Sequence, residues 1–251
     1  MAKIAVGVGQ RIDTLMKATV SRIDILQECY FTSPAFNLAR GTPDVIKAYY
    51  EHISPRFHLQ LDQISVVSSN ILSELAVKIG LFQDAANLEI KIDKMVFLAT
   101  KVQSDKGLTI IKDVLRLAYD ARESAFPEIG TGSARFLVHS WLALDGGEKA
   151  AAEVIGKAAK PKKDIRLLDE GETTKISYNL RIQLNNESEG WGVTVTQEPS
   201  ALPLSHLFVA MDFVFGIKTK YKTLGQQFEF VEEKYANVLS SMGIDDALLR
   251  S

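Results

Sequence analysis

The sequence predicts an α+β protein made by tandem duplication of the order strand–helix–four strands–helix, with antiparallel sheet or sheets and helices packed on one face. Residues 20–126 and residues 132–243 show the same order of predicted elements. Each of these stretches ends in a long segment whose apolar residues recur at the helical period. A short helical segment bounded by a proline has the equivalent place in each stretch. Between the helices, apolar and polar residues alternate, which is typical of half-buried antiparallel strands.

The first repeat begins with a predicted strand over residues 20–31. Thr42, Pro43 and Asp44 form a helix start, with a capping residue, a proline at the first helical position and an acid in the first turn. Pro55 is expected to end this helix. Strands are predicted at 57–62, 75–81, 88–93 and 95–99. A long helix is predicted after Ser104, and Pro127 is expected to end it. The apolar stripe of this helix comprises Leu108, Ile111, Leu115 and Ala118.

The second repeat returns the same order: a strand at 134–144, a short helix at 148–160 ended by Pro161, and strands at 165–167, 175–184, 191–196 and 206–217. Thr223 and Gln226 predict a capping box for the last helix, and Gly243 predicts its end. We expect an N-terminal extension over 1–19, with a short helix near its end, a first repeat over 20–131 and a second over 132–251.

The amino-acid composition and the distribution of charge argue against some classes of function. The chain has 251 residues, of which 46% are hydrophobic and 24% charged, as in ordinary globular proteins. Residues 1–125 carry 15 basic and 14 acidic side chains, and the rest carry 14 and 17. Neither half has the positive excess typical of nucleic-acid-coating proteins. No apolar run could span a bilayer, and the start lacks a signal-peptide core, which together indicate a cytoplasmic protein without membrane association.

Motifs for catalysis, cofactors and metals are missing from the sequence. Gly7 and Gly9 suggest a nucleotide-binding turn, but Ile12 stands where the fingerprint needs glycine. Cys29 is the only cysteine, so an internal disulfide and a cysteine-rich metal site are excluded. The four histidines lack metal-ligand spacing. We therefore predict no catalytic, cofactor-binding or metal-binding residue, and a non-enzymatic protein is favoured.

Two groups of basic residues could belong to a binding surface. One surrounds Pro161 and comprises Lys157, Lys160, Lys162, Lys163 and Arg166; the other comprises Lys218, Lys220 and Lys222, alternating at a predicted strand end. Both are also typical of solvated edges that discourage strand aggregation. The candidate binding face joins the second group to neighbouring polar positions: Arg135, His139, Trp141, Lys175, Arg181, Lys218 and Lys220. The polar sheet face as a whole is expected to carry Gln60, Asp62, Lys91, Lys175, Asn179, Arg181 and Thr194.

The predicted element order is similar to that of the saddle-shaped repeats of the TATA-box-binding protein, which would imply one curved sheet surface. It also resembles helix-grip folds, in which a sheet wraps a long helix around an apolar cavity. The saddle of the TATA-box-binding protein is strongly basic, whereas this chain is slightly acidic, with a formal charge of −2. A topology of this kind does not by itself imply a function.

Three hypotheses follow from the sequence. The first is a non-enzymatic binding or assembly protein that uses an exposed sheet face or helix surface, with another protein or a second copy of the chain as partner. The second is a small-molecule-binding or hydrolytic pocket between a curved sheet and the long helix. The third is nucleic-acid binding through the basic face of the second repeat.

Overall fold

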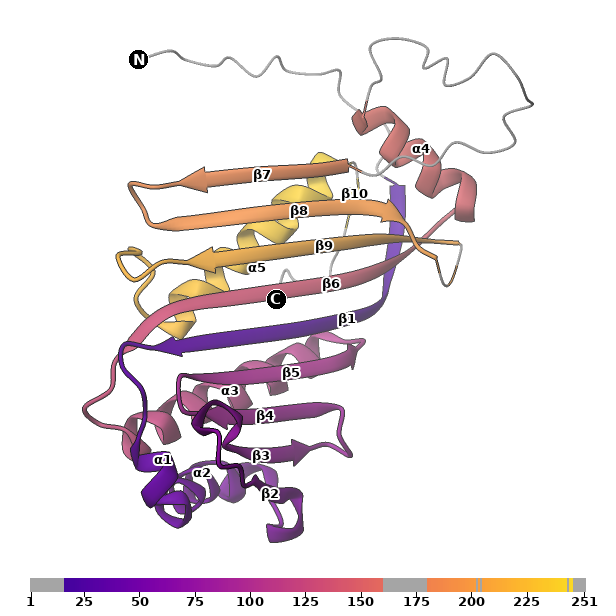
Figure 1. Ribbon diagram of the computed structural model, residues 1–251. Helices are drawn as coiled ribbons and strands as arrows, with labels where there is room; N and C mark the ends of the chain where they lie inside the picture. The colour runs from indigo at the N-terminus through magenta and orange to yellow at the C-terminus, as the bar shows by residue number, and fades with distance from the viewer. Residues whose placement is uncertain (1–15, 160–179, 202, 204, 243, 246–251) are drawn as a thin grey trace.

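The computed structural model describes residues 16–159, 180–201, 203, 205–242 and 244–245. Within these residues, nine strands form one antiparallel sheet in the order β2-β3-β4-β5-β1-β6-β9-β8-β7, and helices pack on one of its faces (Figure 1). A short tenth strand, β10 (Ile244–Asp245), pairs in parallel with the start of β1. This arrangement confirms the predicted α+β class.

The first half comprises β1 (Met16–Phe31), α1 (Asn37–Arg40), α2 (Thr42–Phe57), β2 (Ile64–Val67), β3 (Ala76–Leu81), β4 (Ala86–Lys91), β5 (Lys94–Val102) and α3 (Asp105–Ala125). Two 3-10 turns flank β2, namely η1 (Leu61–Gln63) and η2 (Leu72–Glu74). The second half comprises β6 (Thr131–Leu144), α4 (Gly147–Ala159), β7 (Leu180–Asn186), β8 (Trp191–Pro199), β9 (His206–Phe215) and α5 (Leu224–Ser241).

The duplication is visible in the sheet order. In the first half the strands run β3-β4-β5-β1 toward the centre, and in the second half β7-β8-β9-β6 do the same from the other side. The halves meet where β1 and β6 pair over most of their length, from Ala18 opposite Leu144 to Phe31 opposite Thr131. The chain is therefore a tandem duplication whose two sheets are joined into one.

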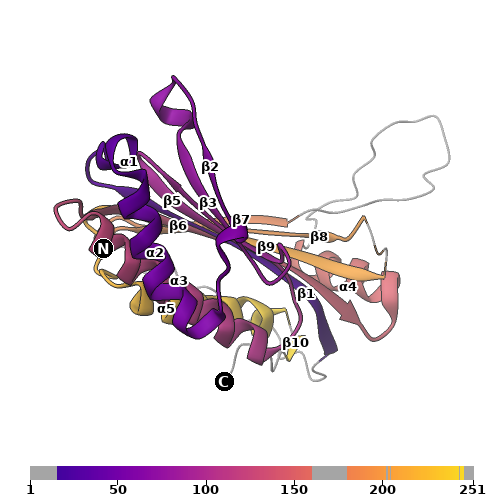
Figure 2. The same cartoon turned by 90° about the horizontal axis from the view of Figure 1, so that it is seen from below.

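The core lies between the sheet and the long helices (Figure 2). Alternate residues of every central strand point to this side, and the largest of them that are fully buried are Phe97, Phe136, Phe213 and Phe215. Burial of aromatic side chains of this size is the main source of stability in such a core. The two long helices are also linked to each other by an ion pair between Lys112 of α3 and Glu232 of α5.

The helix starts form as their sequences predict. The Ser104 hydroxyl accepts a hydrogen bond from the backbone N–H of Gly107 at the start of α3. At the start of α5, the Thr223 hydroxyl accepts one from the N–H of Gln226, while the Gln226 side chain accepts one from the N–H of Thr223. This reciprocal pair is the predicted capping box, and it satisfies donors that the first turn leaves open.

The two short helices are not equivalent in their packing. Helix α2 packs against α3, whereas α4 packs against the strands β6, β8 and β9. Figure 2 shows α2, α3, α5 and α4 on the same side of the sheet, with α4 near one end of the strands. The duplicated order of elements thus holds while the position of the short helix differs between halves.

The prediction of a strand over 57–62 is wrong. Helix α2 runs through Pro55 to Phe57, and the left-handed conformation of His58 (φ 50°, ψ 42°) ends it. Leu61 then begins a 3-10 turn, so Gln60 and Asp62 do not lie on the sheet as predicted. Pro55 removes one backbone hydrogen bond, as a proline does anywhere inside a helix, and α2 accommodates it in its last turn.

Other differences concern element ends. Residues 16–20 belong to β1 rather than to a short helix, because pairing with β6 and β10 outweighs their local apolar spacing. Strand β9 ends at Phe215, so Lys218, Lys220 and Lys222 lie in a turn and not along a strand. The predicted strand at 165–167, the first part of that at 175–184, Pro161 and Gly243 lie outside the described residues.

Candidate functional site

The sheet face opposite the helices, here called the open face, is turned toward the viewer in Figure 1. No described helix covers it. Strand register places its side chains in rows that cross the sheet. One row runs from Arg181 on β7 through Thr196 and Ala210 to His139 on β6 and Asp24 on β1. Residues that are distant in sequence therefore become neighbours on this face.

A network of four charged residues crosses the centre of the open face. Arg135 donates two hydrogen bonds to Asp212, each 2.8 Å long, and its guanidinium lies 3.6 Å from a carboxylate oxygen of Glu28. The other oxygen of Glu28 accepts a hydrogen bond of 2.6 Å from Lys94. Strands β5, β1, β6 and β9 each contribute one member. The network thus joins the two halves by paired, partly buried charges.

These contacts shift the ionisation of the network. Burial alone would raise the pKa of Glu28, but the hydrogen bond and charge of Lys94 outweigh it, so this pKa lies below the ordinary carboxyl value. The hydrogen bonds to Asp212 raise the pKa of Arg135 above that of a free guanidinium. These contacts therefore favour the charged forms of Glu28, Lys94 and Arg135, and the charges of the network are directed at one another.

Three rings form an aromatic cluster on the open face: His139 and Trp141 on β6 and Phe208 on β9. The Phe208 ring centroid lies 5.3 Å from that of His139 and 5.0 Å from that of Trp141. The Arg22 guanidinium stacks over the Trp141 ring at 4.6 Å and hydrogen-bonds Asp24. All three rings are half-buried, so part of each is accessible to a partner.

His139 is neutral in this setting. Burial lowers its pKa below the ordinary value, although the nearby carboxylates of Asp24 and Asp212 act in the opposite direction. A neutral imidazole packs against Trp141 and Phe208 without the desolvation cost of a charge. The cluster therefore behaves as an apolar and aromatic surface at neutral pH.

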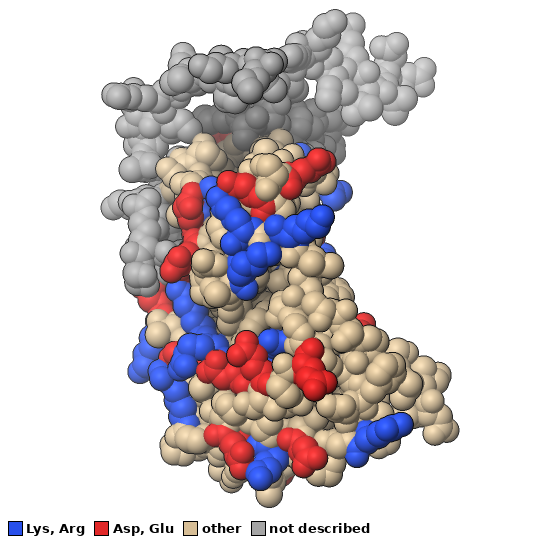
Figure 3. Space-filling view, turned by 90° about the vertical axis from the view of Figure 1, so that its left-hand side faces the viewer, with Lys and Arg blue, Asp and Glu red and all other residues tan. Residues whose placement is uncertain are grey.

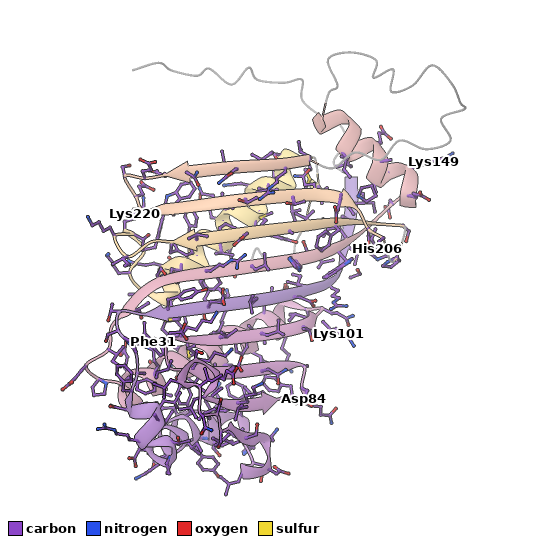
Figure 4. The ribbon with its side chains drawn as sticks, viewed as in Figure 1. Phe31, Asp84, Lys101, Lys149, His206 and Lys220 are labelled. Atoms are coloured by element: carbon purple, nitrogen blue, oxygen red, sulfur yellow. The ribbon has the colours of Figure 1, made fainter. Side chains whose placement is uncertain are left out.

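A groove lies at the other end of the open face, where the β7–β8 hairpin meets the turn after β9. Its walls include the amides of Gln183 and Asn185, and its most exposed apolar residues are Val214 and Ile217, which are 48% and 69% exposed. In Figure 4, His206 marks the start of β9, on the side of the aromatic cluster, and Lys220 marks the turn beyond the end of β9, on the side of the groove.

The structure brings together four of the seven predicted site residues on the open face: Arg135, His139, Trp141 and Arg181. Lys218 lines the groove beyond the end of β9. Lys220 lies in the same turn, where its ammonium group is 2.6 Å from a carboxylate oxygen of Glu189. Lys175 lies outside the described residues. Of the predicted polar face, Lys91, Arg181 and Thr194 are on the open face, and Asn179 is outside the described residues.

The charges do not gather into a uniformly positive surface in the described part of the chain. Figure 3 looks onto the strand ends near the groove and shows Lys and Arg side chains interspersed with Asp and Glu. Of the first basic group, Lys160, Lys162, Lys163 and Arg166 lie outside the described residues, as does the side chain of Lys157.

Sequence reasoning missed several residues of the open face, chiefly Arg22, Glu28, Phe208 and Asp212. The signal was present for β1, where Arg22 and Asp24 alternate with buried Ile23 and Ile25. Strand β9 is mostly apolar on both faces, so its sequence does not show which residues face outward. Phe208 lies on the open face, whereas its neighbours Leu207 and Val209 are buried in the core.

A small apolar cavity lies between the sheet and the two long helices. Its volume is about 30 Å³, and it is lined by Ile23, Ile25, Phe136 and Val138 from the strands and by Leu108, Ile111, Phe228, Val231 and Tyr235 from the helices. Lys112 and Glu232, which pair with each other, are its only charged lining residues. Space of this size holds about one water molecule.

Among the described residues, no group of three or more His, Cys, Asp and Glu side chains is placed to hold a metal ion. None of the described helices is long and apolar enough to cross a membrane.

Comparisons with known proteins give little further information. No family model matches the chain, and no curated protein matches it in sequence. Among solved structures, the chain is similar to one described as Methanococcus jannaschii TBP, with 11% sequence identity over 90% of this chain and 98% of that chain and a TM-score of 0.30.

Proposed function

We propose that the protein is a non-enzymatic binding protein that engages another protein through the open face of its sheet. The observation that carries this proposal is the accessible aromatic cluster beside Arg22, surrounded by charges that are already paired. Tryptophan, tyrosine and arginine are the residue types that most often dominate the binding energy of protein interfaces. Paired charges around such a centre cost less to cover than isolated charges, because each already has a partner of opposite sign.

The pairing of cations also bears on the nucleic-acid hypothesis. Binding to a phosphate backbone relies on cations that can exchange small counterions for phosphates. Five cations of the open face already lie within 4 Å of a carboxylate: Arg22, Lys78, Lys91, Lys94 and Arg135. A phosphate that contacts these residues would have to compete with the carboxylates that already neutralise them. The open face therefore favours a partner of mixed charge over a polyanion.

The pocket hypothesis finds less support than the binding face. A hydrolytic site needs polar groups that converge on a substrate, and the cavity between sheet and helices has an apolar lining with one ion pair at its edge. Its volume of about 30 Å³ is far below that of ordinary ligand sites, which are roughly 300–1,000 Å³.

The proposal is tested by capture of partners from a lysate of the native host, with wild-type protein and the variant Trp141→Ala in parallel, each with and without nuclease. Phe36→Ala serves as the matched control, since Phe36 is 57% exposed and lies outside the sheet. We expect a stoichiometric protein partner that wild type and Phe36→Ala retain after nuclease treatment and that Trp141→Ala loses.

Thermal unfolding of each variant separates loss of binding from loss of folding. With the captured partner purified, a Trp191→Phe background leaves Trp141 as the only tryptophan, so its fluorescence reports directly on coverage of the open face. A partner that binds Trp141→Ala as well as wild type contradicts the proposal. So does a partner that is released by nuclease, which would point to nucleic acid.

A further inference from the structure

The edge of the sheet formed by β2 carries the densest group of exposed apolar side chains in the described residues. Five of the twelve large hydrophobic residues that are exposed fall between positions 61 and 72. They are Leu61 (70% exposed), Val66 (43%), Val67 (37%), Ile71 (56%) and Leu72 (48%). We call this set the β2 patch. Exposed apolar side chains gathered in one short segment of a folded protein often mark an interaction site.

The backbone of β2 is also available for pairing. Strand β2 is the last in the sheet order, so it pairs with β3 on one side and with no described strand on the other. Edge strands of monomeric proteins are commonly protected by lysine, proline or a bulge. Residues 63–73 contain no charged residue, no proline and no glycine. This edge therefore has neither lysine nor proline, and its register with β3 is regular, without a bulge.

The β2 patch is held in a defined conformation. The backbone N–H of Gln60 donates a hydrogen bond of 2.8 Å to the Gln63 side chain at η1, and the Ser69 hydroxyl donates one of 2.8 Å to Glu74. Figure 2 shows β2 and the turn beside it projecting beyond the rest of the sheet. A preformed and projecting edge can be covered without much further loss of conformational entropy.

We propose that a second copy of the chain covers the β2 patch, with β2 of each copy pairing antiparallel across a twofold axis. In β2, Ile64 and Val66 point to the helix side and Ser65 and Val67 to the open face, as their partners on β3 require. A continuous sheet needs opposite residues to point to the same side. The axis therefore passes through Ser65 or Val66.

Both registers suit a symmetric contact. With the axis at Ser65, Ile64 lies opposite Val66 of the partner subunit; with the axis at Val66, Ser65 lies opposite Val67 of the partner subunit. Since residues 63–73 are uncharged, neither register places like charges opposite each other, which favours a second copy over an acidic or basic partner. The contact leaves the aromatic cluster free, so it is independent of the proposed function.

The test is the mass of the purified full chain by analytical ultracentrifugation over a concentration series, for wild type and the double variant Val66→Lys, Val67→Lys. The matched control is Ile217→Lys, which places lysine at an exposed apolar position remote from β2. We expect wild type and Ile217→Lys to form a dimer as concentration rises, and the double variant to remain a monomer with unchanged circular dichroism.

Cross-linking gives a second measurement in case the lysines disturb the hairpin. The native Cys29 is buried, so an introduced surface cysteine reports on its own position. Ser65→Cys or Val66→Cys should form an intermolecular disulfide under mild oxidation, depending on the register, whereas Ser188→Cys at the far edge should not. A wild-type chain that stays monomeric at all concentrations overturns the proposal, and so does a dimer that the double variant retains.

Discussion

Replacing Glu28 with glutamine removes the charge at the centre of the network that joins the two halves. The side chain is 10% exposed, and its cationic partners Lys94 and Arg135 are 22% and 40% exposed. An exposed ion pair contributes roughly 0.2–1 kcal/mol, and breaking a buried one costs roughly 3–5 kcal/mol. Because both cations can turn toward water after the substitution, we expect Glu28→Gln to lower the free energy of unfolding by about 2 kcal/mol at neutral pH.

This loss should depend on pH in a definite direction. The pKa of Glu28 is lowered in the folded protein, so the unfolded chain takes up a proton at this carboxyl first as the pH falls. The stability from Glu28 is therefore fully present above the ordinary carboxyl value of 4.5 and is lost as the pH falls through the folded pKa. Glu28→Gln has no such group, so the difference from wild type should shrink in acid.

Urea unfolding of both proteins, from about pH 7 down to about pH 3, measures this difference. Glu89→Gln is the matched control, since Glu89 is another open-face carboxylate but lies 3.4 Å from Lys78 and 3.5 Å from Lys91 and is 27% exposed. It should cost less than about 1 kcal/mol. If Glu28→Gln is as stable as wild type, or if its loss is the same at every pH, the role given to the network is wrong.

Three further predictions concern stability and are measured by the same unfolding assay. Thr223→Ala should lower the free energy of unfolding by about 1 kcal/mol, because the cap of α5 is lost. Thr223→Ser keeps the hydroxyl and should retain most of this stability. Phe213→Ala, at a fully buried site, should cost about 3–5 kcal/mol, whereas Phe36→Ala, at an exposed one, should change stability by less than about 0.5 kcal/mol. The pKa of His139 is lowered by burial, so wild type should lose stability relative to His139→Phe as the pH falls below about 6.5; a constant difference would contradict this.

The fold could be predicted from sequence because most of its elements have strong local signals. Strand β4 alternates buried and accessible residues along its whole length, and β6 does so from Ala134 onward; the caps at Ser104 and Thr223 mark the helix starts. The prediction failed at 57–62, where Phe57, Leu59 and Leu61 are apolar at alternate positions without belonging to a strand. Phe57 is instead the last residue of α2, and its ring packs edge-on against Phe82.

The candidate site was predictable only in part, because its character depends on which strands are neighbours. Arg135 and Asp212 are 77 residues apart in sequence, and Lys94 and Glu28 are 66 apart. Local sequence patterns show these cations but not the acidic residues that lie beside them on neighbouring strands. A prediction from such patterns therefore gives a positive face. Only the sheet order, with β1 beside β6 and β6 beside β9, reveals that acidic residues lie next to them.

The central pairing of β1 with β6 has a consequence for synthesis of the chain. A ribosome releases β1 first, but the strand that covers its outer edge is not complete until residue 144, and β10 at residues 244–245 is the last to join it. During this interval the nascent first half carries a long unpaired edge, which is a surface that invites association with other chains. Correct folding of the first half in the cell therefore depends on the speed at which the second half follows it.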